Sequence, residues 1–192
     1  MGVFWHDREV IGSHTEPVHT DSRPSSRHVV VMRHAKAEQV AASDMERTLT
    51  NRGRADAAEA GAWLAAVDSV PDHVLVSSSV RTRETWAAVA DAAGWTVEPD
   101  FETALFSAGP ESALDLLRLV VREARSLLVI GHNPTMGYLA QLLSDGLGDE
   151  VAMSEMAGGF PTCALTIFEY DGEWADLELG SARVAAFHVG RG

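Results

Sequence analysis

Short apolar runs, rich in β-branched residues, recur along the chain and end abruptly in polar residues. One run covers residues 28–32, and others cover 73–76 and 127–130. Runs of this length without polar interruption are typical of strands that are buried on both faces of a sheet. A further short strand is expected over 96–98.

Between these strands, apolar residues recur at the spacing of an α-helix. Thr50 suits the N-cap of the first helix, and Gly94 is the residue type that commonly ends a helix such as the second. The pattern predicts helices over residues 50–67, 80–93, 111–125 and 135–143.

Near the C-terminus, two apolar segments flank Asp171-Gly172, a strong signal for a hairpin. The expected strands cover 163–170 and 174–179. Strands that alternate with helices favour a three-layer α/β/α fold with a mainly parallel sheet, and the hairpin adds an antiparallel edge. We expect a single domain over residues 28–192, preceded by a polar, poorly ordered N-terminal extension over 1–27.

The length and cysteine content favour a single-domain globular protein without disulfides. A chain of 192 residues is long enough for one well-buried core and short for two. It contains no apolar run long enough to span a membrane and no apolar core of a signal peptide. Cys163 is its only cysteine, which excludes an internal disulfide and a multi-cysteine zinc site. The expected location is the cytoplasm.

The net charge of −13 argues against partners that are themselves anionic polymers or surfaces. Nucleic acid and anionic membranes attract basic proteins, so we expect neither as a partner. Lys36 is the only lysine, and the other 14 basic residues are arginines. The guanidinium group is suited to phosphate and carboxylate, although a general arginine bias of the genome accounts for this count at least as well.

Polar residues follow three of the predicted strands directly. The first strand ends in Arg33-His34, the second leads into Ser77–Arg81, and the third ends in Gly131-His132-Asn133. In open α/β sheets, ligands bind beyond the carboxyl ends of the strands. Each strand end alone is a weak signal. Together they predict that two histidines and two arginines converge on a site for an anionic, phosphorylated ligand.

These strand ends carry a resemblance to a known family. Residues 29–35, Val-Val-Val-Met-Arg-His-Ala, resemble the Arg-His-Gly/Ala signature of the histidine phosphatase superfamily, whose fold is phosphoglycerate-mutase-like. Residues 49–53, 77–85 and 129–134 are similar to further motifs of the family and occur in the same order. The resemblance covers residues 28–170 and is strongest to the SixA-type phosphohistidine phosphatase branch.

The resemblance implies a role for each residue. His34 is implied as the nucleophile that forms a phosphohistidine intermediate, with its second ring nitrogen bonded to a backbone carbonyl. Arg33 and Arg81 are implied to hold the phosphoryl oxygens, and His132, in its protonated form, to neutralise developing charge. The backbone N–H of Asn133 is a further candidate anion contact. The resemblance implies no metal and no cofactor.

The chain departs from the larger members of the family at the general acid. The corresponding segment places Ser107 at the acid position and leaves Glu102 as the only candidate, a residue that suits a surface position better. Lys36 and Arg52 fit the entrance of the site and a solvated surface equally well. The missing acid favours phosphohistidine as substrate, because an imidazole leaving group departs already protonated.

The leading hypothesis is therefore a metal-independent phosphatase acting on phosphohistidine of a signalling protein. Two alternatives stay open. One is a general or small-molecule phosphomonoesterase of the same superfamily, for which the partner is a small phosphorylated molecule. The other is a non-catalytic phosphate-binding module, although the presence of both Arg33 and His34 argues against it.

Overall fold

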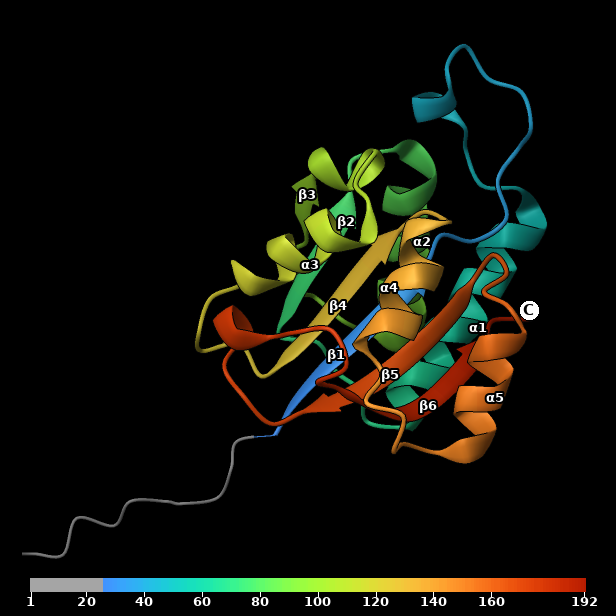
Figure 1. Ribbon diagram of the computed structural model, residues 1–192. Coiled ribbons are helices and arrows are strands. Elements are labelled where there is room, and N and C mark those ends of the chain that lie inside the picture. The colour runs from blue at the N-terminus through green and yellow to red at the C-terminus, as the bar shows by residue number, and fades with distance from the viewer. Residues whose placement is uncertain (1–25) are drawn as a thin grey trace, which may run out of the picture.

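A six-stranded sheet lies at the centre of the computed structural model, which describes residues 26–192 (Figure 1). In the order β3-β2-β4-β1-β5-β6, the first four strands are parallel, β5 is antiparallel to β1, and β6 is antiparallel to β5. The strands are β1 (Arg27–Arg33), β2 (His73–Ser77), β3 (Asp100–Glu102), β4 (Ser126–Gly131), β5 (Ala164–Tyr170) and β6 (Arg183–Val189).

Helices cover both faces of this sheet, so the core has two halves (Figure 1). Val29 and Val31 of β1 belong to one half, whereas Val30 and Met32 belong to the other. This alternation is that of a strand buried on both faces. One half contains α1 (Asn51–Ala66) and α2 (Val80–Ala93), and the other contains α3 (Pro110–Arg118), α4 (Thr135–Leu143) and α5 (Glu150–Gly158).

The predicted three-layer α/β/α fold with an antiparallel edge is confirmed. The Thr50 hydroxyl accepts from the backbone N–H of Gly53 and caps α1, as the sequence predicts. Gly94 ends α2 in the left-handed conformation, with a φ of 70°. None of the helices in residues 26–192 has the length and apolar character needed to cross a bilayer.

Two predicted elements end or begin elsewhere. The strand expected over 96–98 is wrong, because Pro99 lacks an N–H and the pairing of β3 with β2 starts only at Asp100. The helix expected over 111–125 ends at Arg118, the last residue of α3. Leu119, although apolar, is 79% exposed, so the apolar periodicity continues beyond the helix that it suggested.

The hairpin expected around Asp171-Gly172 is also wrong. The chain leaves the sheet after Tyr170 and forms a 3₁₀ turn, η3 (Trp174–Asp176), instead of a strand. The Trp174 side chain is buried there and donates from its indole nitrogen to the carbonyl of Ala124. The antiparallel partner of β5 is therefore the later strand β6. Helix α5, capped by Asp149, was not among the predicted elements.

The expected extension falls almost wholly outside the described residues. Only its last two residues, 26 and 27, are described, and Arg27 is the first residue of β1 rather than part of a tail. Its guanidinium is buried and donates to the Gly172 carbonyl and to the carboxylate of Glu173. This pair lies at the opposite end of β1 from His34.

Helices α1 and α2 cross at a point where one of them has no side chain. A Cβ built on Gly61 of α1 lies 2.3 Å from the carbonyl oxygen of Val89 in α2, a distance at which something must shift. Glycine is therefore required for this approach of the two backbones. Gly158, at the end of α5, has no atom within 4 Å of the same position.

We predict that Gly61→Ala lowers the free energy of unfolding by about 1–3 kcal/mol, the usual cost of overpacking a core. The gain of about 1 kcal/mol in helix propensity does not offset a clash with backbone atoms. The matched control Gly158→Ala should be neutral or stabilising. Urea unfolding of both variants measures the difference, and equal stabilities would contradict the close crossing of α1 and α2.

Candidate active site

The pairing of β1 with β4 brings two predicted histidines together. Arg33 and Gly131 are opposite each other in this parallel pair, so His34 and His132 follow at the same edge of the sheet. The backbone N–H of His34 donates to the carbonyl of Gly131 at 3.0 Å. As a result, the centroids of the two imidazole rings lie 5.2 Å apart.

Arg81 comes from the neighbouring strand end, where β2 leads into α2. The Thr82 hydroxyl lies 2.6 Å from the Ser77 carbonyl and 2.9 Å from that of Ser79, which fixes the turn between strand and helix. Arg81 stands in the first turn of α2, and its residue is only 5% exposed.

All of the predicted phosphate-binding residues line one cavity. It has a volume of about 360 Å³ and an opening to solvent. Its lining residues are Arg33, His34, Lys36, Ala37, Gln39, Asp44, Arg47, Arg81, His132, Asn133 and Thr162. Four of these are basic and one is acidic, in a chain whose net charge is −13. The cavity therefore concentrates positive charge within an acidic protein.

His34 is held in one tautomer. Its Nδ1 lies 2.7 Å from the carbonyl oxygen of Ala35, a group that can only accept, so Nδ1 carries the proton and Nε2 the lone pair. The Ala35 N–H in turn donates to the hydroxyl of Thr85 at 3.0 Å. Burial, followed by the charges of Arg81 and Arg33, lowers the pKa of His34 to about 4. The imidazole is neutral at pH 7.

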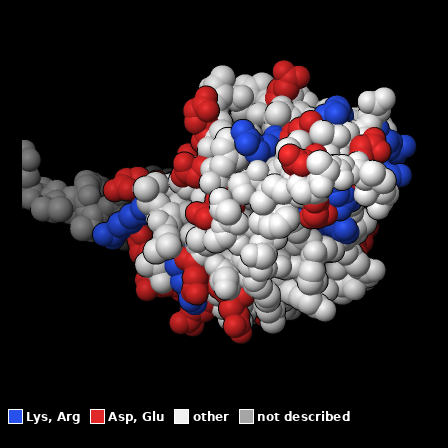
Figure 2. All heavy atoms as spheres, turned by 90° about the horizontal axis from the view of Figure 1, so that it is seen from above, with Lys and Arg blue, Asp and Glu red and all other residues white. Residues whose placement is uncertain are grey.

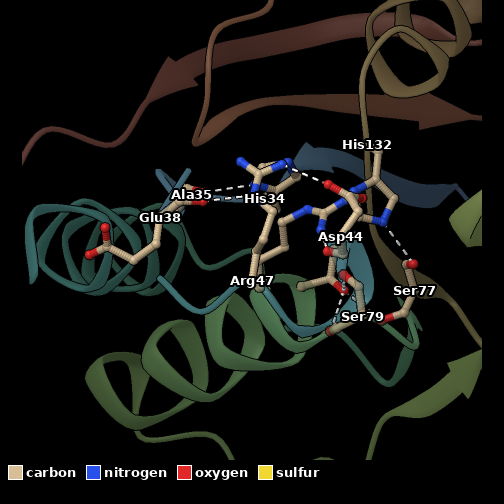
Figure 3. A network of polar contacts seen from close by, with 10 residues as sticks. His34, Ala35, Glu38, Asp44, Arg47, Ser77, Ser79 and His132 are labelled. Atoms are coloured by element: carbon tan, nitrogen blue, oxygen red, sulfur yellow. Dashed lines mark hydrogen bonds and ion pairs between the residues drawn. The ribbon is translucent and has the colours of Figure 1, made fainter. Parts of the chain in front are cut away.

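The surroundings of His132 in the ligand-free protein favour the neutral ring. Burial, together with the nearby charge of Arg81, lowers its pKa to about 3. Its Nε2 is hydrogen-bonded to the Ser77 hydroxyl at 2.9 Å, and its buried Nδ1 has no partner among the described residues (Figure 3). An anion beside this ring would raise its pKa and favour the protonated form.

Arg33 and Asn133 meet at one carbonyl. Nη1 of Arg33 and Nδ2 of Asn133 both donate to the Phe160 oxygen, at 3.0 and 2.7 Å. The amide oxygen of Asn133 accepts from the backbone N–H of Gly137 in α4 at 3.2 Å. Through these two hydrogen bonds, Asn133, which follows β4, is linked to α4 and to the segment before β5.

Glu102 does not line the cavity. It ends β3, on the far side of β2, and its carboxylate accepts from the backbone N–H of Ala104 at 2.9 Å. Lys36 does line the cavity, whereas Arg52 does not and instead forms an ion pair with Asp56 on α1, at 2.6 Å. No group of three or more metal-ligating side chains occurs in the described part of the chain.

The sequence analysis missed two charged residues of the cavity, Asp44 and Arg47. Both lie in or beside η1 (Asp44–Glu46), a 3₁₀ turn between β1 and α1 (Figure 3). The Asp44 carboxylate pairs with Arg81 at 2.9 Å and with Arg47 at 2.8 Å. These ion pairs, with that of Arg47 contributing most, lower the pKa of Asp44. This polar segment has no apolar periodicity. The only sequence signal for Asp44 and Arg47 was that they follow the strand that ends in Arg33-His34.

Basic and acidic side chains are interspersed on the face of the molecule seen in Figure 2, with a broad neutral area between them. That face presents no extended surface of positive charge. The basic residues of the cavity are thus a local feature, suited to a single anionic group rather than to a polyanion.

Comparisons with known proteins agree with this geometry. A family model described as the histidine phosphatase superfamily (branch 1) matches residues 29–105. A SixA phosphohistidine phosphatase homolog of Haemophilus influenzae is 31% identical over 66% of this chain and 94% of its own length. The solved structure of a putative phosphohistidine phosphatase SixA from Nakamurella is 30% identical, with a TM-score of 0.76, and covers 86% of this chain and 96% of its own.

Two further solved structures extend the comparison. A SixA protein histidine phosphatase complexed with tungstate is 25% identical over 85% of this chain and 97% of its own, with a TM-score of 0.70. A phosphoglycerate mutase of Plasmodium falciparum, 16% identical over 87% of this chain and 93% of its own, has a TM-score of 0.55 and shows the likeness of fold alone. By its fold and its SixA relatives, the chain belongs to the histidine phosphatase superfamily.

Proposed function

We propose that this phosphatase removes the phosphoryl group from phosphohistidine on a cytoplasmic signalling protein, through a phosphohistidine intermediate on His34. The observation that carries the proposal is the state of the His34 ring: neutral, with its Nδ1 proton bonded to Ala35 and its Nε2 lone pair free. A nucleophilic imidazole requires this state. The arginines of the same cavity supply the positive charge that a phosphoryl group requires.

In the first step, the lone pair of His34 Nε2 attacks phosphorus, and the bond from phosphorus to the leaving group breaks. The electron pair of that bond stays with the leaving imidazole, and the phosphoryl group is now attached to His34. In the second step, water attacks phosphorus and the bond to Nε2 breaks. Inorganic phosphate leaves, and His34 regains its lone pair. A His34→Asn substitution would remove the ring nitrogen that takes part in both steps of this cycle.

Arg33, Arg81 and His132 stabilise the transferring group in this mechanism. The non-bridging oxygens carry most of the charge in the transition state, so donors fixed around them lower the barrier. His132 enters as a neutral ring, and the phosphoryl dianion favours its protonation once bound. The backbone N–H of Asn133 is a further anion contact in this proposal.

Phosphohistidine is the favoured substrate because the cavity offers no suitable general acid. Among residues 26–192, Asp44 is the only one with a carboxyl group that lines the cavity, and its two ion pairs favour the ionised form. An imidazole leaving group does not need a proton from the enzyme, whereas an alkoxide does. The names of the SixA relatives support the same choice. A general phosphomonoesterase is the second candidate, which a carboxylic acid placed to protonate the leaving group would favour.

We predict that His34→Asn abolishes hydrolysis of a phosphohistidine protein and of nitrophenyl phosphate, while EDTA leaves the wild-type rate unchanged. Arg33→Ala and Arg81→Ala should each lower turnover by about a hundredfold or more, the usual cost of losing one transition-state donor. Rates of release of radiolabelled phosphate measure these changes in turnover. Acid-labile label that stays on the protein after quenching in alkali detects the phosphohistidine intermediate.

The matched control is His73→Asn, which replaces a histidine at the opposite end of the sheet, at the start of β2. This variant should keep full activity. Turnover by His34→Asn, or dependence of the wild type on a divalent metal, would falsify the covalent histidine mechanism. An active wild type without label on His34 would have the same consequence.

We predict that two histidine rings of the ligand-free protein stay neutral until the pH falls below about 5. The pKa values of His34 and His132 are about 4 and about 3, below the ordinary 6.5. The unfolded chain takes up these protons near pH 6.5, so stability is lost as the pH falls from there towards 3. NMR titration of the ring signals tests this, and His34→Asn and His132→Asn assign them. Titration of both rings near 6.5 would contradict their burial.

We predict a steep dependence of rate on the leaving group. Without a positioned acid, phosphohistidine and nitrophenyl phosphate should be cleaved about 10²- to 10⁴-fold faster than glycerol phosphate, the range attributed to general acid catalysis. Glu102→Gln should change turnover of phosphohistidine less than about tenfold. Efficient cleavage of alkyl phosphates, or loss of activity in Glu102→Gln, would instead support the general phosphomonoesterase.

A further inference from the structure

The segment of residues 38–48 forms a projecting loop beside the cavity. Its base is closed by a backbone bridge between Ala37 and Leu49 and by the hydrogen bond from the Glu38 N–H to the Thr48 carbonyl, at 2.9 Å. In Figure 1 the loop extends, in light blue to teal, beyond the carboxyl ends of the strands. The turn η1 lies within it.

Asp44 joins this loop to the proposed phosphoryl site. Its backbone carbonyl accepts from Nη1 of Arg81, and its Oδ2 accepts from Nη2 at 2.9 Å. Its other oxygen, Oδ1, accepts from Nη1 of Arg47 at 2.8 Å, while Arg47 Nε donates to the Glu38 carbonyl (Figure 3). A single carboxylate therefore bridges two guanidinium groups that line the same cavity.

The Asp44 carboxylate places a negative charge between two positively charged side chains. Arg47 and Arg81 carry like charges, and the carboxylate between them offsets the repulsion of those charges. The Arg81 side chain is 6% exposed, so its charge is poorly screened by water and depends on this partner. The Phe106 ring also lies beside the guanidinium, with its centroid 5.7 Å from the guanidinium carbon.

The bridge also leaves part of Arg81 free. A guanidinium has five N–H donors, and Asp44 takes one from each terminal nitrogen. The Nε of Arg81 is buried and has no partner among the described residues. One edge of the guanidinium is therefore held by the loop, and donors of the other edge remain for an oxyanion.

We propose that Asp44 is a positioning residue, which holds Arg81 and Arg47 in place at the cavity so that their remaining donors bind the phosphoryl oxygens. This inference rests on the proposed function, and it adds the loop of residues 38–48 to the machinery of the site. Asp44 acts through these two arginines and touches no substrate atom.

The opposite role, a carboxylate that competes with the substrate for Arg81, makes the opposite prediction. Removal of a competing anion would tighten the binding of phosphate-like ions. Removal of a positioning residue weakens that binding, because Arg81 and Arg47 then have to be ordered at the expense of ligand affinity.

The experiment compares tungstate affinity, measured by calorimetry, and kcat/KM for nitrophenyl phosphate in three single variants. Asp44→Ala should weaken both by about tenfold or more, the scale of a lost hydrogen bond to a charged group. Asp44→Asn keeps an acceptor oxygen without the charge and should fall between Asp44→Ala and wild type. The control Glu46→Gln removes a carboxylate from the same turn, one that contacts Ser43, and should match wild type.

A double-mutant cycle identifies the route of the effect. In the Arg81→Ala background, Asp44→Ala should weaken tungstate binding clearly less than in the wild-type background, because only Arg47 is left for Asp44 to position. A similar loss in both backgrounds would overturn the proposal. Circular dichroism and thermal unfolding establish that each variant is folded. If Asp44→Ala does not fold, Asp44→Asn takes its place in the cycle.

Three further outcomes would overturn the inference: tighter tungstate binding by Asp44→Ala, equal affinities in Asp44→Ala and wild type, or no binding by wild type. Failure of the proposed function is distinct from these. A wild type that binds tungstate but cleaves none of the phosphorylated substrates refutes the phosphatase, while the affinities still decide whether Asp44 positions Arg81.

Discussion

The parallel pairing of β1 with β4 is the constraint on which the site depends. It places Arg33 opposite Gly131, so the rings of the residues that follow, His34 and His132, lie with their centroids 5.2 Å apart. Both backbone groups of His34 are used to hold it there: its N–H donates to Gly131, and its carbonyl accepts from Cys163 at the start of β5. A side chain whose backbone is fixed by two neighbouring strands needs little rearrangement on binding a ligand.

Burial and charge act together on the chemistry of this edge. The two imidazoles are kept neutral by burial and by the adjacent arginines, although the protein as a whole is strongly acidic. In the proposed mechanism a neutral His34 attacks phosphorus, and the same arginines that lower its pKa attract the phosphoryl group. Asp44 is the one acidic side chain that lines the cavity in the described part of the chain, and it forms ion pairs with Arg47 and Arg81.

The central strands and their helices were predictable because burial on both faces leaves a simple apolar pattern, as in residues 28–32. Errors arose where the pattern and the packing differ. Leu119 continues an apolar periodicity in solvent, and Trp174 leaves the sheet to bury its ring against the chain near Ala124. Neither fact is visible in the local sequence, because each depends on residues that are distant along the chain.

By itself the sequence determined the fold class, the strand ends and the four residues that converge there, Arg33, His34, Arg81 and His132, because a parallel sheet collects its carboxyl ends at one edge. Only the tertiary structure decided the state of those residues. Burial of His132 lowers its pKa and favours the neutral ring. Glu102 lies outside the cavity because β3 is the edge strand of the sheet. The part of Asp44 follows from a loop that folds back onto α2, a contact between residues 37 positions apart, which local patterns do not encode.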